Sequence, residues 1–520
     1  MTHLSRSLVL GASILALAAC GPEDLGSPGT NGDINIGDIN IDNSNNSGGG
    51  SGGSGGTVTP AADCPDLGTA DALTNSGTIT GPEGEWLVCT LPSVFTESAT
   101  LPYQAGLLYE MNGRVDIGVD DGPTADATDG VTGTIVDLTI EDGVILFGRK
   151  GVSGGSYLVA QRGSKLFAEG TAARPIIFTA EDNVTGRVSN TSSALWGGVV
   201  LLGRGPVADC FAGGINPADQ LDCEMRVEGI ANNIPFFGGN TPADSSGSVK
   251  YTQIRYSGFT LDLGGELQSL TLGGIGSGTE LDYIQSFNSS DDGTEFFGGH
   301  VNMKHFVAVG AEDDSIDTDS GVQANLQYVI AIQRDGVGDR VLESDSPPDD
   351  KGAGTTIPDA LPRSKTQVSN FVFWAASGAN DATESRGASD LTLANGVIIK
   401  PAGSTGQCMD DNSDVGGGRR AAQFLYSVLL DCPTGGDTDA AVAAGSDSVF
   451  TTNTLSSKYI NGSAESGFSP VYNATALSTF FSAPTFIGAV SGTNWATGWT
   501  CDSDTVSFGS GKSCYSLPVY

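Results

Sequence analysis

Carboxylates are concentrated in one segment of this 520-residue chain. Residues 291 to 350 contain fourteen acidic side chains, against the bases Lys304, Arg334 and Arg340. Two pairs of neighbouring aspartates start 22 residues apart, at Asp291 and Asp313. Carboxylate oxygens are preferred ligands of Ca²⁺. Six aspartates of the segment are therefore candidate calcium ligands: Asp291, Asp292, Asp313, Asp314, Asp317 and Asp319.

A repeated strand pattern would position these pairs. The apolar runs 281–287, 303–309 and 326–332 start 22 and 23 residues apart, which is typical of one coil of a parallel β-helix. The run 249–254 fits the same pattern. The run 368–374 starts later than this spacing predicts, which indicates that one coil contains the additional loop 335–351. This repeat favours a β-helix over the alternative of two β-sandwiches.

In such a helix, like positions of neighbouring coils lie about 5 Å apart. The two aspartate pairs would stack at one corner and repel each other unless a cation neutralised them. Two interpretations stay open. The corner either binds Ca²⁺ or is a solvated row of turn residues, where Asp is favoured by turn geometry.

Composition and other motifs exclude several functions. Lys and Arg total 24 against 61 Asp and Glu, a net charge of -37, so we expect no nucleic acid partner. Residues 511–513 lack the leading glycine of a phosphate loop, so we expect no nucleotide. Residues 151–155 match the Gly-x-Ser-x-Gly pattern but lack its strand-to-helix context and are predicted to form a turn. His300 and His305 could share a metal, but a buried or rim histidine is the favoured interpretation of His305.

The N-terminus is typical of an exported lipoprotein. Residues 1–19 have the charged and apolar regions of a signal peptide. Residues 17–20 resemble the lipobox, which implies diacylation of Cys20, for instance with palmitate. Gly21 follows this cysteine instead of Asp, which indicates the outer membrane, facing either the periplasm or the cell surface. Residues 20–62 are rich in Gly, Ser, Asn and Asp and are predicted to be a disordered tether.

Eight cysteines follow Cys20, as near neighbours along the chain. An even number of clustered cysteines in an exported protein indicates disulfides. We expect four local bridges, although spacing alone does not fix their pairing: Cys64–Cys89, Cys210–Cys223, Cys408–Cys432 and Cys501–Cys514.

Further Gly-rich and aromatic motifs occur along the chain, at residues 162–171, 174–179, 196–198, 256–258, 291–299 and 486–489, with Trp495 and Trp499. In these motifs the chain resembles Gly-rich right-handed parallel β-helix proteins and lipoproteins of bacteria. It implies an all-β fold with an N-terminal β-rich cap over 63–140, a right-handed parallel β-helix over 141–500, and a disulfide-closed segment over 501–520. The twin runs 236–239 and 296–299 are predicted to place aromatic rings inside the helix rather than on a sugar-binding surface.

From these features we predict a lipid-anchored module of the cell surface that binds polysaccharide or another surface protein, or has a structural role. Bound Ca²⁺ would stabilise its acidic turns. The alternative is a Ca²⁺-dependent uronate lyase, because the Asp-Asp turns also resemble the calcium-binding turns of β-helical pectate lyases. In that case Lys304 is the candidate base, and otherwise no catalytic residue is expected.

Overall fold

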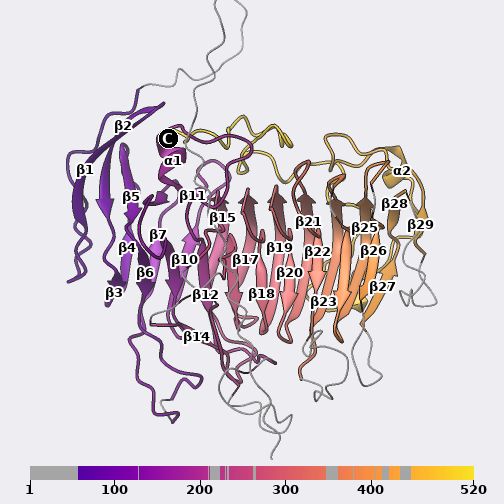
Figure 1. Cartoon of the computed structure of the whole chain (residues 1–520), viewed down its shortest axis with the longest axis horizontal. Coiled ribbons are helices and arrows are strands. Elements are labelled where there is room, and N and C mark those ends of the chain that lie inside the picture. Colours follow the sequence, from indigo (N-terminus) through magenta and orange to yellow (C-terminus); the bar gives the residue numbers. More distant parts are fainter. Residues whose placement is uncertain are drawn as a thin grey trace, which may run out of the picture. The chain divides into compact units, whose positions relative to one another are not determined.

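The fold is given by a computed structural model, which describes residues 57–126, 128–208, 210, 223–228, 230, 233–261, 265–346, 361–378, 380–404, 406–412, 421–433 and 447–520. The predicted signal peptide, Cys20 and the predicted tether up to residue 56 lie outside the described residues. Figure 1 shows successive coils with strands stacked side by side.

Almost all regular structure is β. The strands are β1 (Thr74–Gly81), β2 (Gly84–Thr90), β3 (Val94–Phe95), β4 (Ala99–Leu101), β5 (Leu107–Met111), β6 (Arg114–Ile117), β7 (Asp137–Ile140), β8 (Ile145–Gly148), β9 (Tyr157–Ala160), β10 (Lys165–Glu169), β11 (Ile176–Ala180), β12 (Val199–Leu202), β13 (Met225–Arg226), β14 (Phe236–Phe237), β15 (Gly247–Arg255), β16 (Leu270–Gly273), β17 (Glu280–Phe287), β18 (Glu295–Phe297), β19 (His300–Val309), β20 (Asp317–Asp319), β21 (Gln323–Ile332), β22 (Leu342–Ser344), β23 (Lys365–Trp374), β24 (Thr383–Arg386), β25 (Asp390–Ile399), β26 (Met409–Asn412), β27 (Ala422–Tyr426), β28 (Leu429–Asp431) and β29 (Val449–Phe450). The described helices are short: α1 (Glu181–Val184), α2 (Ser463–Ser466) and the 3₁₀ helix η2 (Ala474–Ala476). None of the described helices is long and apolar enough to cross a membrane.

The strands form two long sheets that run the length of the helix. Sheet A contains β15, β17, β19, β21, β23 and β25 as parallel neighbours. Sheet B is parallel throughout, in the order β3, β6, β9, β12, β16, β18, β20, β22, β24, β26. From β15 to β25 each coil supplies one strand to each sheet, and this parallel pairing confirms the parallel β-helix. Earlier coils supply two short strands to sheet A, since β10 and β11 both pair with β15.

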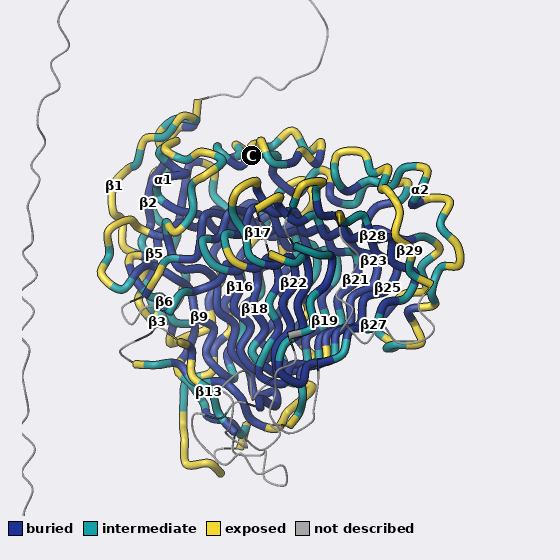
Figure 2. Tube along the Cα trace, turned by 45° about the vertical axis from the view of Figure 1, so that its right-hand side comes forward, coloured by how far each residue is buried: buried dark blue, intermediate teal, exposed yellow. Residues whose placement is uncertain are grey.

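The register of sheet A follows the sequence repeat. Leu281 pairs with Met303, Met303 with Leu326, and Leu326 with Val368 across the longer coil. Val249 pairs with Leu281 on the other side. The five apolar runs therefore start at equivalent positions, and their Leu, Met and Val side chains stack in one buried core. Figure 2 shows these stacked strands as a largely buried interior, with exposed residues at the turns and ends.

Sheet A bends at one position in each coil. The bend residues have positive φ, at 47° for Tyr251, 56° for Tyr283, 47° for His305 and 65° for Tyr328. Such a φ is strained for residues other than glycine. Ring stacking offsets this strain, because the neighbouring ring centroids lie 4.3, 4.1 and 4.9 Å apart in order along the helix. We call these four residues the aromatic stack.

The helix starts earlier than the sequence boundary at residue 140. Strand β2 pairs with β5, and β5 with β8, all parallel, so the coils extend through the predicted cap. Only β1 runs antiparallel to β2 at this end. The prediction missed these coils because their strands are short and their repeat is irregular.

At the other end, residues 451–520, here called the C-terminal strap, add no strand to either sheet in the described chain. The helix therefore ends near β29 and not at residue 500. The four expected disulfides are confirmed: Cys64–Cys89, Cys210–Cys223, Cys408–Cys432 and Cys501–Cys514.

Candidate metal centre on sheet B

One register position of sheet B carries a carboxylate in five successive coils. In order, Glu295 pairs with Asp317, then Glu343, Glu384 and Asp410. The next residue after Glu295, Phe296, lies in the core, so strand alternation turns Glu295 to the outer face. Neighbouring strands are about 4.8 Å apart, which forces these charges close together. We call these five residues the acidic row.

The turn that precedes each of these strands adds more carboxylates. The backbone amide of Asp314 donates to Asp292 Oδ1 at 2.9 Å, and that of Arg340 donates to Asp314 Oδ1 at 2.5 Å. The turns of three coils are therefore joined in register. This arrangement brings together the two aspartate pairs that the sequence spacing placed one coil apart.

Four groups of carboxylates have oxygens within 4.8 Å of one another. They are Asp291, Asp292 and Asp313; Asp292, Glu295 and Asp317; Asp313, Asp314 and Asp339; and Asp314, Asp317 and Glu343. Five of the six predicted ligands belong to these groups. The sixth, Asp319, lies at the end of β20, where its carboxylate accepts from the Ser320 hydroxyl at 3.0 Å, and it is in none of the four groups.

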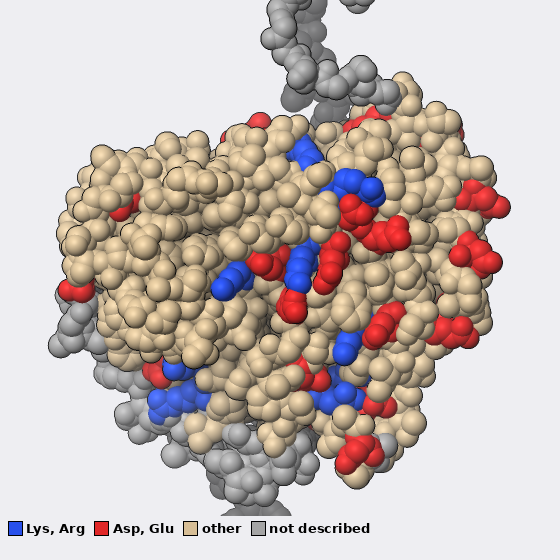
Figure 3. Space-filling view, turned by 180° about the vertical axis from the view of Figure 1, so that it is seen from behind, with Lys and Arg blue, Asp and Glu red and all other residues tan. Residues whose placement is uncertain are grey.

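Arginines neutralise the later part of the acidic row. Arg386 forms ion pairs with Glu343 and, at 3.7 Å, with Asp345. Arg340 pairs with Glu384, whose side chain is only 4% exposed. Figure 3, which views one face of the helix, also shows acidic and basic side chains next to each other. Part of the large negative charge is thus compensated within the protein.

The earlier part of the acidic row has no such compensation. Within the described ranges, no Lys or Arg forms an ion pair with Asp292, Glu295 or Asp317. Glu295 is 8% exposed and accepts no hydrogen bond from the described residues. A buried carboxylate without a partner is costly, and here two further carboxylates lie beside it.

Burial and mutual repulsion raise the pKa values in this part of the site. The pKa of Asp291 is raised to about 7, mainly by burial and then by Glu266 and Asp313. Burial also raises the pKa values of Asp292, Glu295 and Asp317 well above their ordinary range, and the neighbouring carboxylates raise them further. Near neutral pH the group must therefore hold protons or a cation.

The donor set fits a hard divalent cation. Asp292, Glu295 and Asp317 would supply only oxygen ligands, as Ca²⁺ and Mg²⁺ require, and the site contains no thiolate. The two histidines of the described chain are not in any of the four groups. His305 belongs to the aromatic stack, and its Nδ1 lies 2.7 Å from Asp282. A softer metal that prefers imidazole or sulfur is not favoured.

Lys304 is not brought to this site. It lies on β19 of sheet A, and its ammonium is 4.8 Å from the centre of the Phe480 ring in the C-terminal strap. Among the described residues the cations beside the acidic row are instead Arg340 and Arg386. Lys304 as the base for chemistry at the aspartates therefore has no geometric support.

The sequence did not predict that the five residues of the acidic row align with one another. Glu295 follows Leu281 by the same interval as Asp317 follows Met303, and that regularity was the available signal. Glu343 and Glu384 follow coils whose loops differ in length, so their alignment could not be read from spacing. Arg386 lies outside the acidic segment, and only the pairing of β22 with β24 reveals its role.

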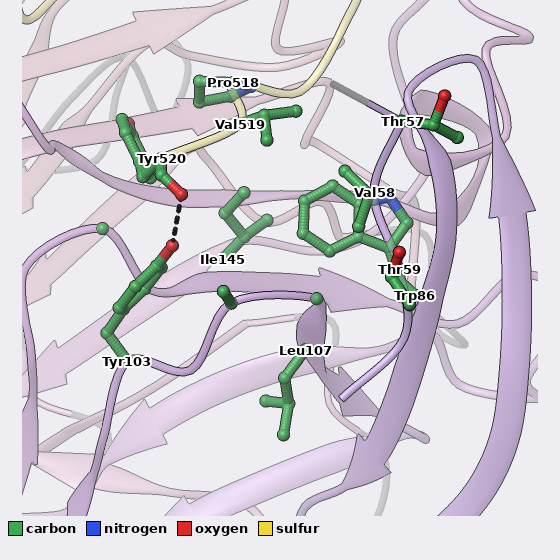
Figure 4. Close-up of a pocket in the computed structure, with 13 residues that line it drawn as sticks. Thr57, Val58, Thr59, Trp86, Tyr103, Leu107, Ile145, Pro518, Val519 and Tyr520 are labelled. Carbon is green, nitrogen blue, oxygen red and sulfur yellow. Dashed lines mark hydrogen bonds between the residues drawn. The ribbon is translucent and has the colours of Figure 1, made fainter. Parts of the chain in front are cut away.

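Aromatic residues outside the stack have structural contacts. Phe237 packs 6.0 Å from Phe297 over the outer face of sheet B, while Phe296 lies in the core. A pocket of about 320 Å³ lies at the other end of the helix, between Trp86, Tyr103 and Tyr520 (Figure 4). The side chains that line it include no Asp, Glu, Lys, Arg or His, so they offer no acid-base chemistry comparable to that of sheet B.

A family model described as a pectate-lyase-like β-helix domain matches residues 129–500. No curated protein and no solved structure matches the chain.

Proposed function

The chain belongs to the family of pectate-lyase-like β-helix domains, and from this premise we propose that it is a Ca²⁺-binding module for acidic polysaccharide. The proposed calcium ligands are Asp292, Glu295 and Asp317, with Asp291, Asp313 and Asp314 beside them. The observation that carries the proposal is Glu295, a buried carboxylate that lies beside two others and has no partner among the residues that the structure describes. A bound cation removes the repulsion among these groups.

The net charge of the protein limits the class of polysaccharide that it could bind. A net charge of -37 repels a polyanion unless a divalent cation connects the two. When bound, Ca²⁺ would supply positive charge and free coordination positions for a uronate carboxylate. Arg340 and Arg386 lie beside the later coils, where a second carboxylate of the same polymer could approach. We therefore propose uronate polymers as ligands, with nucleic acids and nucleotides excluded.

We further propose that the module is held at the outer membrane through lipid on Cys20. The support is the sequence alone: a signal peptide over 1–19, the lipobox-like residues before Cys20, and Gly21 after it. The Gly- and Ser-rich residues up to 62 would then carry the domain away from the membrane surface, where it can meet a polymer or a surface protein.

A second candidate function is a uronate lyase. In that reaction a base removes the proton α to the uronate carboxylate, a carbon-carbon double bond forms, and the glycosidic carbon-oxygen bond breaks. The support is the presence of two arginines beside the carboxylates. However, Arg340 and Arg386 are both held in ion pairs, and an arginine with a carboxylate partner keeps its proton. Binding without turnover is therefore our first proposal.

One experiment separates these functions. Purified protein is added to immobilised polygalacturonate, alginate and a neutral glucan, each with Ca²⁺ or with a chelator, and the released sugar is followed by ultraviolet absorbance of the unsaturated product. We expect Ca²⁺-dependent retention on a uronate polymer without new absorbance. Absorbance that depends on Ca²⁺ would establish the lyase, and equal retention with chelator would contradict the calcium-dependent module.

A further inference from the structure

The C-terminal strap packs against the helix outside its two sheets. Apart from α2 and η2 it has only isolated bridges in the described structure, and these join strap residues to one another. In Figure 1 the yellow end of the chain runs back along the bend of sheet A and ends near α1. Because the strap provides no strand, the hydrogen-bonded sheets from β2 to β29 are complete without it.

Buried side-chain amides of the helix bind the main chain of the strap. The Gln285 oxygen accepts from the Cys501 amide at 2.8 Å, while its nitrogen donates to the Cys501 carbonyl at 3.2 Å. Asn395 makes the same two-way contact with Tyr472, at 2.8 and 2.9 Å. A side-chain amide has the donor and acceptor of a peptide group, so each pair resembles a strand pairing.

The same type of contact recurs along the groove. Gln327 forms a two-way pair with Ser482, and Asn370 donates to the Phe486 carbonyl at 2.9 Å. Near the end of the strap, Arg255 donates to the carbonyls of Cys514 and Ser516 at 3.1 and 3.0 Å. The strap does not follow the coils in order, because Tyr472 lies at β25, Ser482 at β21 and Phe486 at β23. Side-chain amides of the helix therefore bind the main chain of a peptide that folds back on itself, and not that of a straight extended strand.

Two tryptophans provide apolar anchors for this interaction. Trp495 lies 4.9 Å from the ring of His305, and Trp499 lies 5.8 Å from that of Tyr283, both edge-on to the aromatic stack. Trp499 is almost fully buried. Buried aromatic anchors surrounded by hydrogen bonds are typical of tight interfaces.

The strap is not covalently joined to the helix except through the chain itself. Its disulfide, Cys501–Cys514, links two strap residues, and the other three bridges lie before residue 451. The surface under the strap contains Gln253, Gln285, Gln327, Asn370, Asn395 and Arg255, which water can solvate. Loss of the strap would therefore expose a mixed polar and aromatic groove. It would also remove strap side chains such as Ile487, Val490 and Phe508 from the buried apolar cluster that they share with the coil interior.

We propose that the helix, residues 57–450, is a receptor that binds a peptide through its main chain, and that the C-terminal strap is its bound ligand and can rebind from a separate chain. The strap also completes the pocket of Figure 4. There Tyr103 donates to the Tyr520 carbonyl at 2.9 Å, and Pro518 and Val519 form one wall. The pocket is thus present only while the strap is docked.

A cleavable chain tests this proposal. A protease site is inserted at the exposed residues 451–452 of the full-length protein, the purified protein is cut, and the strap is separated in mild denaturant and labelled. We expect the cut protein to stay together before separation, the isolated helix to keep its β circular dichroism, and the labelled strap to rebind at one per helix. Gln285→Ala and Asn395→Ala should each weaken rebinding by about 10-fold or more, because each removes a two-way contact.

Asn325→Ala is the matched control, because Asn325 is an amide of sheet A that contacts Asn302. It should leave rebinding unchanged. Unfolding of the helix after strap removal would overturn the proposal, since the strap would then be part of one folding unit. Failure of the strap to rebind a folded helix, or equal weakening by Asn325→Ala, would also overturn it.

Discussion

The backbone amide of Asp314 donates a 2.9 Å hydrogen bond to the carboxylate of Asp292, its neighbour one coil earlier. This bond holds the Asp292 carboxylate against the next coil, so the side chain cannot swing into water to escape its neighbours. Repulsion in the acidic site must therefore be relieved by protons or by a cation. The following predictions rest on that constraint.

Removal of one buried charge should stabilise the metal-free protein. Glu295→Gln keeps the shape of the side chain but removes a charge that has no described partner. We expect the free energy of unfolding in chelator at pH 7.5 to rise by ~1–2 kcal/mol, measured by urea denaturation. Stabilisation by added Ca²⁺ should be smaller than in the wild type.

Glu280→Gln is the control for this prediction. Glu280 is an exposed carboxylate that pairs with Lys250. It lies on sheet A, whereas the acidic row lies on sheet B. The substitution should change the stability in chelator by under ~1 kcal/mol, because the pair with Lys250 is exposed, and it should leave the effect of Ca²⁺ unchanged. If Glu295→Gln destabilised the protein with or without Ca²⁺, the charge of Glu295 would not be what destabilises the metal-free protein.

The stability of the metal-free protein should decrease as pH rises. The pKa of Asp291 is about 7 in the folded state, above its ordinary value near 4, so the folded protein binds more protons than the unfolded chain between these pH values. Stability from this group is fully present below about pH 4 and is lost as pH rises through 7. Melting temperatures in chelator should fall from pH 5 to pH 8. The fall should be larger for the wild type than for the Asp291→Asn variant.

Excess Ca²⁺ should flatten this pH dependence, because the cation takes the place of the protons. The same melting series with Ca²⁺ tests this point. A steep fall that persists at saturating Ca²⁺ would mean that the titrating carboxylates are not its ligands.

The internal arginines should contribute most to the stability of the fold where their carboxylate partners are most buried. Arg340→Ala removes an ion-pair partner of Glu384, whose side chain is 4% exposed. Loss of one partner of a buried pair costs ~3–5 kcal/mol. Lys250→Ala, which breaks an exposed pair with Glu280, should cost under ~1 kcal/mol. Urea denaturation of both variants checks the contrast, and equal losses would contradict it.

The anchor is testable in cells. In the host bacterium, Cys20→Ser should release the protein from the outer-membrane fraction into the soluble periplasmic or extracellular fraction, because the acylated residue is lost. Cell fractionation with immunodetection measures this, and Cys64→Ser serves as a control that keeps Cys20. Continued membrane association of Cys20→Ser would remove the support for a lipid anchor.

The fold was largely predictable because the apolar runs that start at residues 281, 303 and 326 repeat at nearly constant spacing. Equal spacing is enough to align Leu281 with Met303 and Leu326, and hence Asp291 with Asp313. Irregular coils before residue 140 gave no such signal, so their parallel pairing was missed. The bend of sheet A was also missed, since a positive φ at Tyr or His is unfavourable and depends on stacking between coils.

The site was predicted in part. Sequence spacing found the stacked aspartates, but it could not align Glu343 and Glu384 across loops of unequal length. It also placed Lys304 near the acidic site, because the side chain lies on a strand next to the segment. Only the three-dimensional path of the coil shows that β18 and β19 belong to different sheets.

The most direct test of the calcium site is anomalous diffraction from crystals of the folded domain soaked in Ca²⁺. We predict an anomalous peak bounded by the carboxylates of Asp292, Glu295 and Asp317, and its absence in Glu295→Gln crystals soaked in the same way. Well-diffracting, fully soaked crystals without a peak at these three residues would contradict the account.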